Sequence, residues 1–184
     1  MSESKKVDFD LSSFSSPNHY RGRSHLVVLL WWLCQATVFA WSPQPMYGFR
    51  RFLLRAFGAH IGRGVLIRPS VKVVYPWKLY IGDYSWIGDD ASLYSLDTIV
   101  IGSNTVISQR CYLSAGAHDY TKSSFDLTLI PIRIGDSCWL ATDVFVAPGV
   151  EIVSNSIVGA RSSVFKSIKE AGVYFGTPAK RKVE

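Results

Sequence analysis

His118 is the side chain of this sequence whose type and position best suit proton transfer. The chain has four histidines, and His118 is the one that stands inside the regular repeat of its later part. His19 and His25 lie in the N-terminal segment, and His60 lies where the repeat begins. Because the pKa of an imidazole lies close to neutral pH, such a ring can take a proton from a weakly nucleophilic alcohol. A lone histidine is more often structural than catalytic, so its role depends on the elements around it.

Five cations lie close together near the C-terminus: Lys166, Lys169, Lys180, Arg181 and Lys182. An anionic nucleotide needs ammonium or guanidinium groups at one end of its binding groove. These side chains are therefore candidates for contact with phosphates, and an ordinary solvated tail is the alternative.

The three cysteines show neither a disulfide framework nor a catalytic pattern. Their number is odd, which argues against a small disulfide-stapled domain. Cys111 and Cys138 fall at a position of the repeat reserved for small residues, so we expect both thiols in the core. Cys34 lies in an apolar segment that we expect to be helical. No activated nucleophile is evident, because a reactive thiol needs an activating base and exposure.

From Ile61 onward the chain follows a six-residue period. Each unit begins with an aliphatic residue, often continues with glycine, and carries a small residue at its fifth position. The clearest units are IGRGVL (61–66), IGDYSW (81–86), IGSNTV (101–106) and IGDSCW (134–139). A period of six fits neither an α-helix nor a simple meander. It predicts a parallel β-helix, in which the aliphatic residues fill the interior and stacked coils bury each other's open faces.

The spacing of equivalent isoleucines gives the size of each coil. The positions compared are Ile61, Ile81, Ile101, Ile134 and Ile152. The first two intervals are 20 residues, the third is 33 and the last is 18, which together predict about five coils. The long interval contains an excursion within His118–Ile132, the only large break in the repeat. Long loops on regular solenoids usually carry function, and His118 stands at the mouth of this one.

Asp97 is a candidate partner for the second ring nitrogen of His118. It precedes His118 by 21 residues, close to one coil, so the two side chains could lie in adjacent coils. An acceptor on one nitrogen would hold the ring in a single tautomer. A backbone carbonyl could do the same, and Asp97 could instead cap a turn. Asp119 and Tyr120, which follow His118, are predicted to face the acceptor substrate.

Residues 1–59 precede the repeat and differ from it in character. Met1–Tyr20 is polar and serine-rich, and we expect it to be poorly ordered. Leu26–Trp41 is strongly apolar but, at 16 residues, short for a membrane span. Tyr47–Phe57 has apolar residues at helical spacing with arginines between them. We expect two helices packed on the body of the protein or on a neighbouring subunit; contact with an anionic membrane surface and a true span are the alternatives.

The composition is that of one domain of 184 residues with a buried core. With 48% hydrophobic and 18% charged residues, it excludes a disordered or collagen-like chain. A formal charge of +6 is modest and would suit a phosphorylated ligand or an anionic membrane face as well as nucleic acid. No nucleic-acid partner is predicted, and the absence of a signal peptide and the free thiols favour a cytoplasmic location.

These motifs resemble those of the left-handed β-helix acyltransferases that use acetyl-CoA. The shared features are the HDY at 118–120, the CW of IGDSCW, VAPGVEI at 146–152 and GTPAK at 176–180. Segments from about Asn18 onward resemble more narrowly the WcaF-like colanic acid acetyltransferases of exopolysaccharide and capsule pathways. Those segments include YGFRRFLLRAFGAHIGRGV (47–65), YPWKLYIGD (75–83) and ISQRCYLSAGAHDY (107–120).

The resemblance implies an all-β fold, a left-handed parallel β-helix with an N-terminal helical extension. The extension would be residues 1–59, the catalytic β-helix 60–170 and a CoA-contacting tail 171–184. His118 would be the general base, with the acetyl-CoA arm in a groove between two subunits of a homotrimer. The residues assigned by the resemblance to acetyl-CoA are Trp139 at the thioester, Thr142 and Ala160 along the arm, Lys166 at the phosphates, and Lys180, with Arg181 or Lys182, at the nucleotide 3′-phosphate.

Three positions depart from the family pattern. Phe165 replaces the usual threonine before the lysine, Ala141 replaces a glycine, and Ser95 replaces an asparagine near Asp97. The first loses a hydroxyl contact with the cofactor, and the last leaves the contacts around Asp97 open.

The prediction is an acetyl-CoA-dependent O-acetyltransferase that modifies a sugar hydroxyl in exopolysaccharide or capsule biosynthesis. The acceptor would be a sugar or a lipid-linked oligosaccharide, the attack direct, and no metal required. A lipid-linked acceptor would give the apolar N-terminal region a reason to touch the inner face of the membrane. A sugar N-acetyltransferase and a non-catalytic scaffold are the alternatives. A zinc enzyme would need about three convergent histidines, whereas the repeat contains one.

Overall fold

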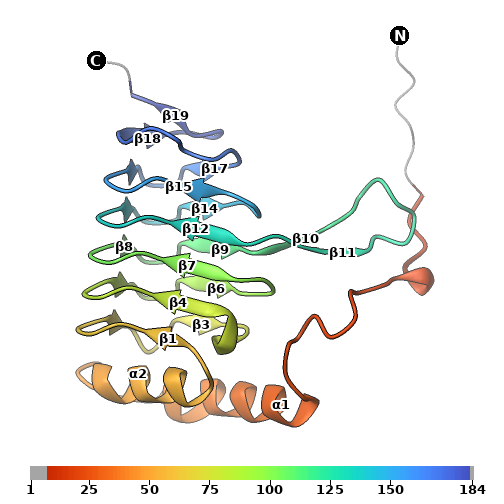
Figure 1. The fold of residues 1–184 in the computed structure, drawn as a ribbon, viewed down its shortest axis with the longest axis horizontal. Helices are drawn as coiled ribbons and strands as arrows, with labels where there is room; N and C mark the ends of the chain where they lie inside the picture. The colour runs from red at the N-terminus through yellow and green to blue at the C-terminus, as the bar shows by residue number, and fades with distance from the viewer. Residues whose placement is uncertain (1–7, 183–184) are drawn as a thin grey trace.

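The computed structural model describes residues 8–182 and shows a triangular prism of stacked coils with two helices across one end (Figure 1). A short 3-10 helix, η1 (Leu11–Ser13), precedes α1 (His25–Cys34), which runs directly into a π-helical turn, η2 (Gln35–Phe39). Helix α2 (Tyr47–Ala56) follows. Both expected N-terminal helices are therefore present.

Three parallel sheets form the flanks of the prism, and each coil contributes one strand to each sheet. Sheet A contains β1 (His60–Ile61), β4 (Leu79–Ile81), β7 (Ile99–Ile101), β12 (Ile132–Ile134) and β15 (Glu151–Ile152). Sheet B contains β2 (Leu66–Ile67), β5 (Trp86–Ile87), β8 (Val106–Ile107), β13 (Trp139–Leu140), β16 (Ile157–Val158) and β18 (Val173–Phe175), with β19 (Lys180–Arg181) antiparallel to β18. Sheet C contains β3 (Lys72–Val73), β6 (Ser92–Tyr94), β9 (Tyr112–Ser114), β14 (Phe145–Val146) and β17 (Ser163–Val164).

The register follows the isoleucine spacing of the sequence. Ile61 pairs with Ile81, Ile81 with Ile101, Ile101 with Ile134, and Ile134 with Ile152. Five coils are complete, and a bridge between Ile152 and Ile168 together with β18 begins a sixth, so the helix has about six turns.

The interior is filled as the hexapeptide pattern predicts. The leading aliphatic residues are buried, and so are the fifth-position residues: Val65, Val71, Ser85, Ala91, Thr105, Cys111, Cys138, Val144, Val150, Ser156 and Ser162. Burial raises the pKa of the Cys111 thiol to about 11 and also raises the pKa of Cys138. Both thiols are therefore protonated core groups at neutral pH.

Close stacking also explains the glycine at the second position of many units. A Cβ at Gly82 would lie 2.5 Å from the backbone nitrogen of Ser103 in the next coil, and one at Gly102 would lie 2.6 Å from that of Asp136. A side chain there would force the coils apart.

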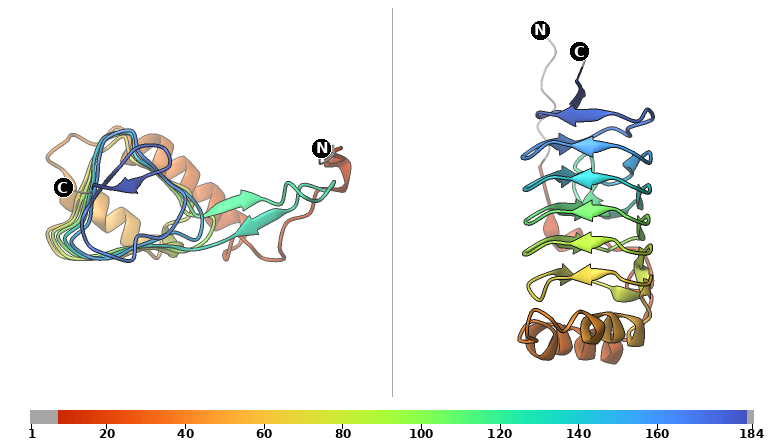
Figure 2. Two further views of the ribbon diagram at one scale, coloured as in Figure 1. Left: turned by 90° about the horizontal axis from the view of Figure 1, so that it is seen from above. Right: turned by 90° about the vertical axis from the view of Figure 1, so that its left-hand side faces the viewer.

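The irregular parts of the coil all fall at one corner, between sheet C and the next strand of sheet A. In the first coil this corner holds a 3-10 turn, η3 (Pro76–Lys78). In the third coil it holds an antiparallel hairpin of β10 (Gly116–His118) and β11 (Leu127–Leu129). The excursion therefore starts two residues before the predicted boundary at His118, and it projects from the prism (Figure 2).

Helices α1 and α2 close the end of the prism below the first coil (Figure 1). The backbone of this coil has no coil beneath it, so its polar groups need other partners. The Trp31 indole donates to the carbonyl of Val73 at 2.8 Å, and Arg50 Nε donates to the carbonyl of Ile67 at 2.6 Å. Arg51 and Arg55 donate to other carbonyls of the coil. The helices thus cap an otherwise open β-edge.

Residues 8–20 are not the poorly ordered tail expected for Met1–Tyr20. Asp10 N donates to the Ser123 carbonyl at 2.9 Å, and Leu127 N donates to the Ser15 carbonyl at 3.1 Å. These bonds hold the N-terminal segment against the hairpin. Residues 1–7 lie outside the described part of the chain.

Candidate active site

His118 lies at the end of β10 with its side chain exposed to solvent. Its Nδ1 is 2.9 Å from the carbonyl oxygen of Phe125, and its ring stacks on that of Phe125 with centroids 4.3 Å apart and planes 4° apart. A carbonyl can only accept a hydrogen bond, so in the neutral ring the proton resides on Nδ1. Nε2 is then the basic nitrogen, and no described residue forms a hydrogen bond with it.

Asp97 lies directly below the start of the hairpin, where its backbone N–H donates to the Ala115 carbonyl at 3.1 Å. Its Oδ1 accepts from the backbone N–H of the next residue, Thr98, at 2.6 Å. The partner of His118 Nδ1 is instead the backbone carbonyl of Phe125. Asp97 therefore lies near the hairpin without orienting the ring in this chain, and a role at the acceptor site stays a prediction.

Asp119 and Tyr120 lie beside His118 in the hairpin. Asp119 Oδ1 accepts from the backbone N–H of Thr121 at 3.0 Å and from its hydroxyl at 2.6 Å. These two bonds are the main cause of the lowered pKa of Asp119 and tie its carboxylate into the turn. The Tyr120 side chain is 70% exposed and free to meet a ligand.

The N-terminal segment contributes to the site in a way that the sequence pattern did not reveal. We call residues 9–24 the strap. The Phe14 ring lies 5.9 Å from that of His118, and the Phe9 ring lies 4.9 Å from that of Phe125. The strap thus packs on both the candidate base and the residue that orients it. Phe9 and Phe14, two aromatic residues in an otherwise polar and serine-rich segment, are the sequence feature that could have indicated this packing.

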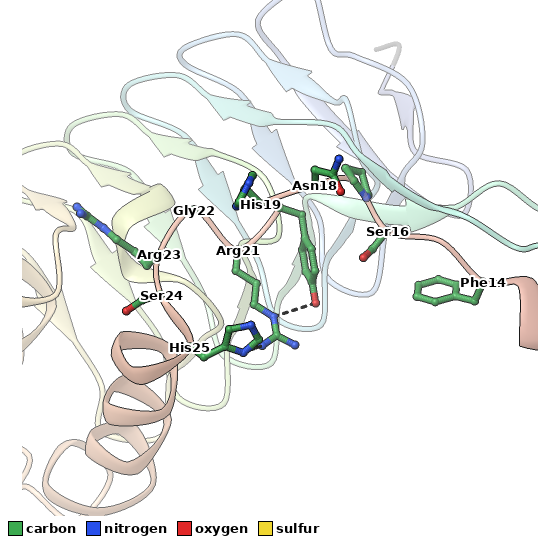
Figure 3. Close-up of a pocket in the computed structure, with 11 residues that line it drawn as sticks. Phe14, Ser16, Asn18, His19, Arg21, Gly22, Arg23, Ser24 and His25 are labelled. Carbon is green, nitrogen blue, oxygen red and sulfur yellow. Dashed lines mark hydrogen bonds between the residues drawn. The ribbon is translucent and has the colours of Figure 1, made fainter.

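A cavity of about 970 Å³ is lined by the strap and the first residue of α1 (Figure 3). Its polar lining includes His19, Arg21, Arg23 and His25. Arg21 Nε donates to the Tyr20 hydroxyl at 3.1 Å, and Arg21 Nη1 lies 3.2 Å from His25 Nδ1. No carboxylate lines this cavity, so its charge suits an anionic or polyhydroxyl ligand.

Phe14 joins this cavity to the candidate base. It lines the cavity and also lies next to His118. A ligand that fills this cavity as far as Phe14 would come close to the imidazole, which itself lies outside the lining.

Trp139 lies on sheet B, and Thr142 and Ala160 lie at the corner that follows this sheet. Trp139 is 49% exposed on the outer face of sheet B, and its indole donates to the Ser108 hydroxyl at 2.9 Å. Thr142 and Ala160 follow β13 and β16 in adjacent coils, at the corner between sheets B and C. The Thr142 hydroxyl donates to the Gln109 carbonyl of the coil below at 3.1 Å. Thr142 and Ala160 are equivalent positions of adjacent coils and form a column parallel to the prism axis.

Lys166 lies at a different corner. It follows β17, two residues beyond Val164, which is in register with Val146 and Leu113. This is the corner between sheets C and A, from which the hairpin with His118 leaves. Within one chain, Lys166 and His118 are therefore at the opposite end of sheet C from the Thr142–Ala160 column.

The remaining predicted cations lie at the top of the prism. Lys180 is in β19, opposite Phe175 of β18, and its side chain is exposed. Arg181 forms an ion pair with Glu170 at 2.5 Å. Lys180 is thus better placed than Arg181 to meet an added phosphate.

Within residues 8–182, no group of three or more His, Cys, Asp and Glu side chains is arranged to hold a metal ion. In the same part of the chain, no helix is both long and apolar enough to cross a membrane.

No protein-family model matches the chain. It is 58% identical over 170 residues to a protein of Escherichia coli K12 named "Putative colanic acid biosynthesis acetyltransferase WcaF", covering 92% of this chain and 93% of that protein. The chain belongs to the WcaF family of hexapeptide-repeat acetyltransferases. Another E. coli K12 relative of this WcaF-family enzyme, named "Putative lipopolysaccharide biosynthesis O-acetyl transferase WbbJ", is 30% identical over 136 residues, covering 67% of this chain and 68% of that protein.

Solved structures share the fold of the WcaF-family chain. A galactoside acetyltransferase in complex with coenzyme A superimposes with a TM-score of 0.79 at 24% identity, covering 91% of this chain and 82% of that one. The acetyl-CoA complex of the hexapeptide-repeat acetyltransferase VCA0836 from Vibrio cholerae gives 0.76 at 22% identity, with 85% of each chain covered. The expected left-handed parallel β-helix with an N-terminal helical part is confirmed, and so is the class of enzyme.

Proposed function

We propose that this acetyltransferase moves an acetyl group from acetyl-CoA to a sugar hydroxyl during surface polysaccharide biosynthesis. The observation that carries the proposal is the exposed His118 ring, whose Nδ1 is committed to the Phe125 carbonyl and whose Nε2 is available as a base. The names of the relatives, which refer to colanic acid and to lipopolysaccharide O-acetylation, support the acceptor class.

In the proposed reaction His118 Nε2 removes the acceptor proton while the hydroxyl oxygen attacks the thioester carbonyl carbon. The Phe125 carbonyl stabilises the imidazolium that forms, because it faces the proton on Nδ1. When the carbon–sulfur bond breaks, His118 returns the proton to the CoA thiolate. The products are the acetyl ester and free CoA, and the ring is neutral again. Direct attack agrees with the cysteines, of which Cys111 and Cys138 are buried and protonated.

We propose that the active site forms between two subunits of a homotrimer. The Thr142–Ala160 column would line the CoA arm on one subunit, with Trp139 beside it at the thioester, and His118 and Lys166 would come from its neighbour. The support is that these sets lie at opposite ends of sheet C within one chain. Lys180, at the top of the prism, would meet the nucleotide 3′-phosphate.

The acceptor would be a sugar or a lipid-linked oligosaccharide that approaches from the strap side. The cavity next to Phe14 carries His19, Arg21 and Arg23, which suit hydroxyl groups and a phosphate linkage. Asp97, Asp119 and Tyr120 would contact the same acceptor. The reaction would take place in the cytoplasm, close to the inner face of the membrane.

The test is to supply purified enzyme with acetyl-CoA and surface glycan from cells that lack the protein. We expect release of CoA thiol and a glycan product that is heavier by one acetyl group per modified sugar. Mild alkali should remove the new group, because an ester is hydrolysed under conditions that leave an amide intact. An alkali-stable product would replace the O-acetyltransferase with the N-acetyltransferase, and a preparation that binds no CoA would indicate a scaffold.

A further inference from the structure

The outer side of α1 is apolar. Its exposed leucines are Leu26, Leu29, Leu30 and Leu33, with exposed fractions of 66%, 58%, 48% and 63%. Their spacing of i, i+3, i+4 and i+7 places them on one face of the helix. The opposite face holds Val28 and Trp31, both fully buried against the prism. Helix α1 is therefore apolar on the side where a helix at a water-facing surface carries polar residues.

Helix α2 buries an arginine as well as Leu54 on the side that faces the prism. Arg50 is fully buried, and Arg50, Arg51 and Arg55 direct their guanidinium groups to carbonyls of the first coil and of the preceding loop. The Phe52 side chain is 64% exposed. The segment before α2 adds Trp41, which is 84% exposed.

Helices α1 and α2 lie across the end of the prism opposite the C-terminus (Figure 2). We call the outer side of this end the base face, and the exposed apolar residues of its elements are Leu26, Leu29, Leu30, Trp32, Leu33, Val38, Trp41, Met46 and Phe52. So many exposed apolar side chains on two adjoining helices mark an interaction site.

Cations outnumber carboxylates around the base face, and the carboxylates that come near, Asp83 and Asp89 of the second coil, are paired with Arg63 and Arg68. The sequence has no Asp or Glu between Leu11 and Gly82, a stretch that contains all of α1, α2 and the first coil. The same stretch contains nine Lys and Arg residues: Arg21, Arg23, Arg50, Arg51, Arg55, Arg63, Arg68, Lys72 and Lys78. Arg23 is exposed just before the first leucine of α1.

We propose that the base face docks on the surface of a membrane that contains anionic lipid, with α1 lying in the plane of the interface. Exposed leucines beside cations, with indole rings at the same level, are what a helix at the lipid–water boundary presents. A second copy fits less well, because two base faces would bring like charges together. An acidic protein could match the charge, but the broad leucine and tryptophan surface fits acyl chains.

Docking in this way fixes the orientation of the prism relative to the membrane. The prism axis would stand across the membrane plane, because α1 and α2 lie across its end (Figure 1). The strap begins at the hairpin and ends at α1, so it would run from His118 down to the lipid surface. This deepens and rests on the proposed function, since it favours an acceptor whose lipid tail stays in the membrane.

Flotation with vesicles tests the docking independently of catalysis. We expect the full-length protein to float with vesicles of phosphatidylcholine containing about one third phosphatidylglycerol, and to bind less as salt is raised. The double variant Leu29→Gln/Leu33→Gln should bind at least about tenfold more weakly, since each buried leucine contributes strongly to partitioning. Leu11→Gln is the matched control, because Leu11 is a leucine of 64% exposure at the far end of the strap, and it should float like wild type.

The result that would overturn the proposal is wild-type protein that stays at the bottom with these anionic vesicles at low salt. Equal flotation of wild type and the double variant would overturn it too, as would lipid-free self-association through the base face without flotation. Two further readouts separate this proposal from the catalytic one. His118→Ala should float normally, and the double variant should keep wild-type turnover on a water-soluble sugar acceptor.

Discussion

Two corners of the prism differ in a way that locates the chemistry. The corner between sheets B and C is uniform from coil to coil, with left-handed residues at Asp90, Arg110, Asp143 and Arg161. The corner between sheets C and A is different in each coil and holds η3, then a short insertion, then the hairpin with His118. The regular corner gives a straight column along which an extended ligand can lie. The irregular corner gives a reactive group a place where insertion does not disturb the core.

The largest expected effect is at the irregular corner. His118→Ala should lower turnover by about 10²–10⁴-fold, because it removes the proposed base, while acetyl-CoA binding persists. Steady-state release of CoA thiol measures the turnover, and calorimetry measures the binding of acetyl-CoA. His60→Ala is the control, an exposed histidine that stacks on Tyr80 at 4.5 Å, and its turnover should stay at the wild-type level. Near-normal turnover of His118→Ala would remove the catalytic assignment.

The two corners share one core, and a core substitution should affect both. Leu113 is fully buried in β9, three residues before the hairpin begins at Gly116. Leu113→Ala should lower the free energy of unfolding by about 2–5 kcal/mol, because it leaves a cavity between stacked coils. Urea unfolding at one fixed protein concentration measures this. Leu11→Ala, at an exposed position, should change it by no more than about 0.5 kcal/mol; equal effects would contradict the packing described.

The strap should matter for turnover more than for donor binding. Phe14→Ala removes a ring that packs on His118, so the imidazole should lose part of its positioning. We expect kcat to fall about tenfold with little change in the KM for acetyl-CoA. Phe14→Leu, which keeps apolar bulk, should recover most of the loss. A change confined to the KM for acetyl-CoA would place Phe14 at the donor instead.

The smallest effect should come from the regular corner. The hydrogen bond and charge of Arg110, at 2.7 Å, hold the pKa of Asp143 below its usual 3.8. The carboxyl group of Asp143 binds a proton less readily in the folded chain than in the unfolded chain. The ion pair with Arg110 therefore stabilises the fold at pH values above 3.8, and this stabilisation is lost as the pH falls through the lowered pKa of Asp143. Asp143→Asn should therefore cause only a slight loss of thermal stability at pH 7, smaller still in acid or high salt. A loss that is unchanged at low pH would show that the charge is not its cause.

The sequence predicted most of the β-helix because each hexapeptide obeys the same local rule. The burial of Cys111 and Cys138 and the isoleucine register follow from period and spacing alone. The exposure of His118 also agrees with its position at the mouth of the excursion.

The contacts around His118 were less predictable, because they join segments far apart in the sequence. Phe125 provides the orienting carbonyl from the loop of the hairpin, two residues before β11, and Phe14 reaches the ring from the strap. Neither position belongs to the repeat, so no period points to it. The predicted role of Asp97 as the orienting group depended on the coil spacing, which placed Asp97 one coil below but could not show its hydrogen-bond partner.

The most direct test of the central claim is complementation between two inactive variants. The claim is that His118 of one subunit acts on acetyl-CoA held along the Thr142–Ala160 column of another. His118→Ala removes the base, and Ala160→Trp blocks the column at an exposed position. Random assembly of equal amounts of the two variants should regain about a quarter of wild-type turnover, because about three quarters of the trimers are then mixed and each mixed trimer has one of its three interfaces built from two intact halves. Turnover no higher than that of either variant alone, in trimers shown to be mixed, would contradict the claim.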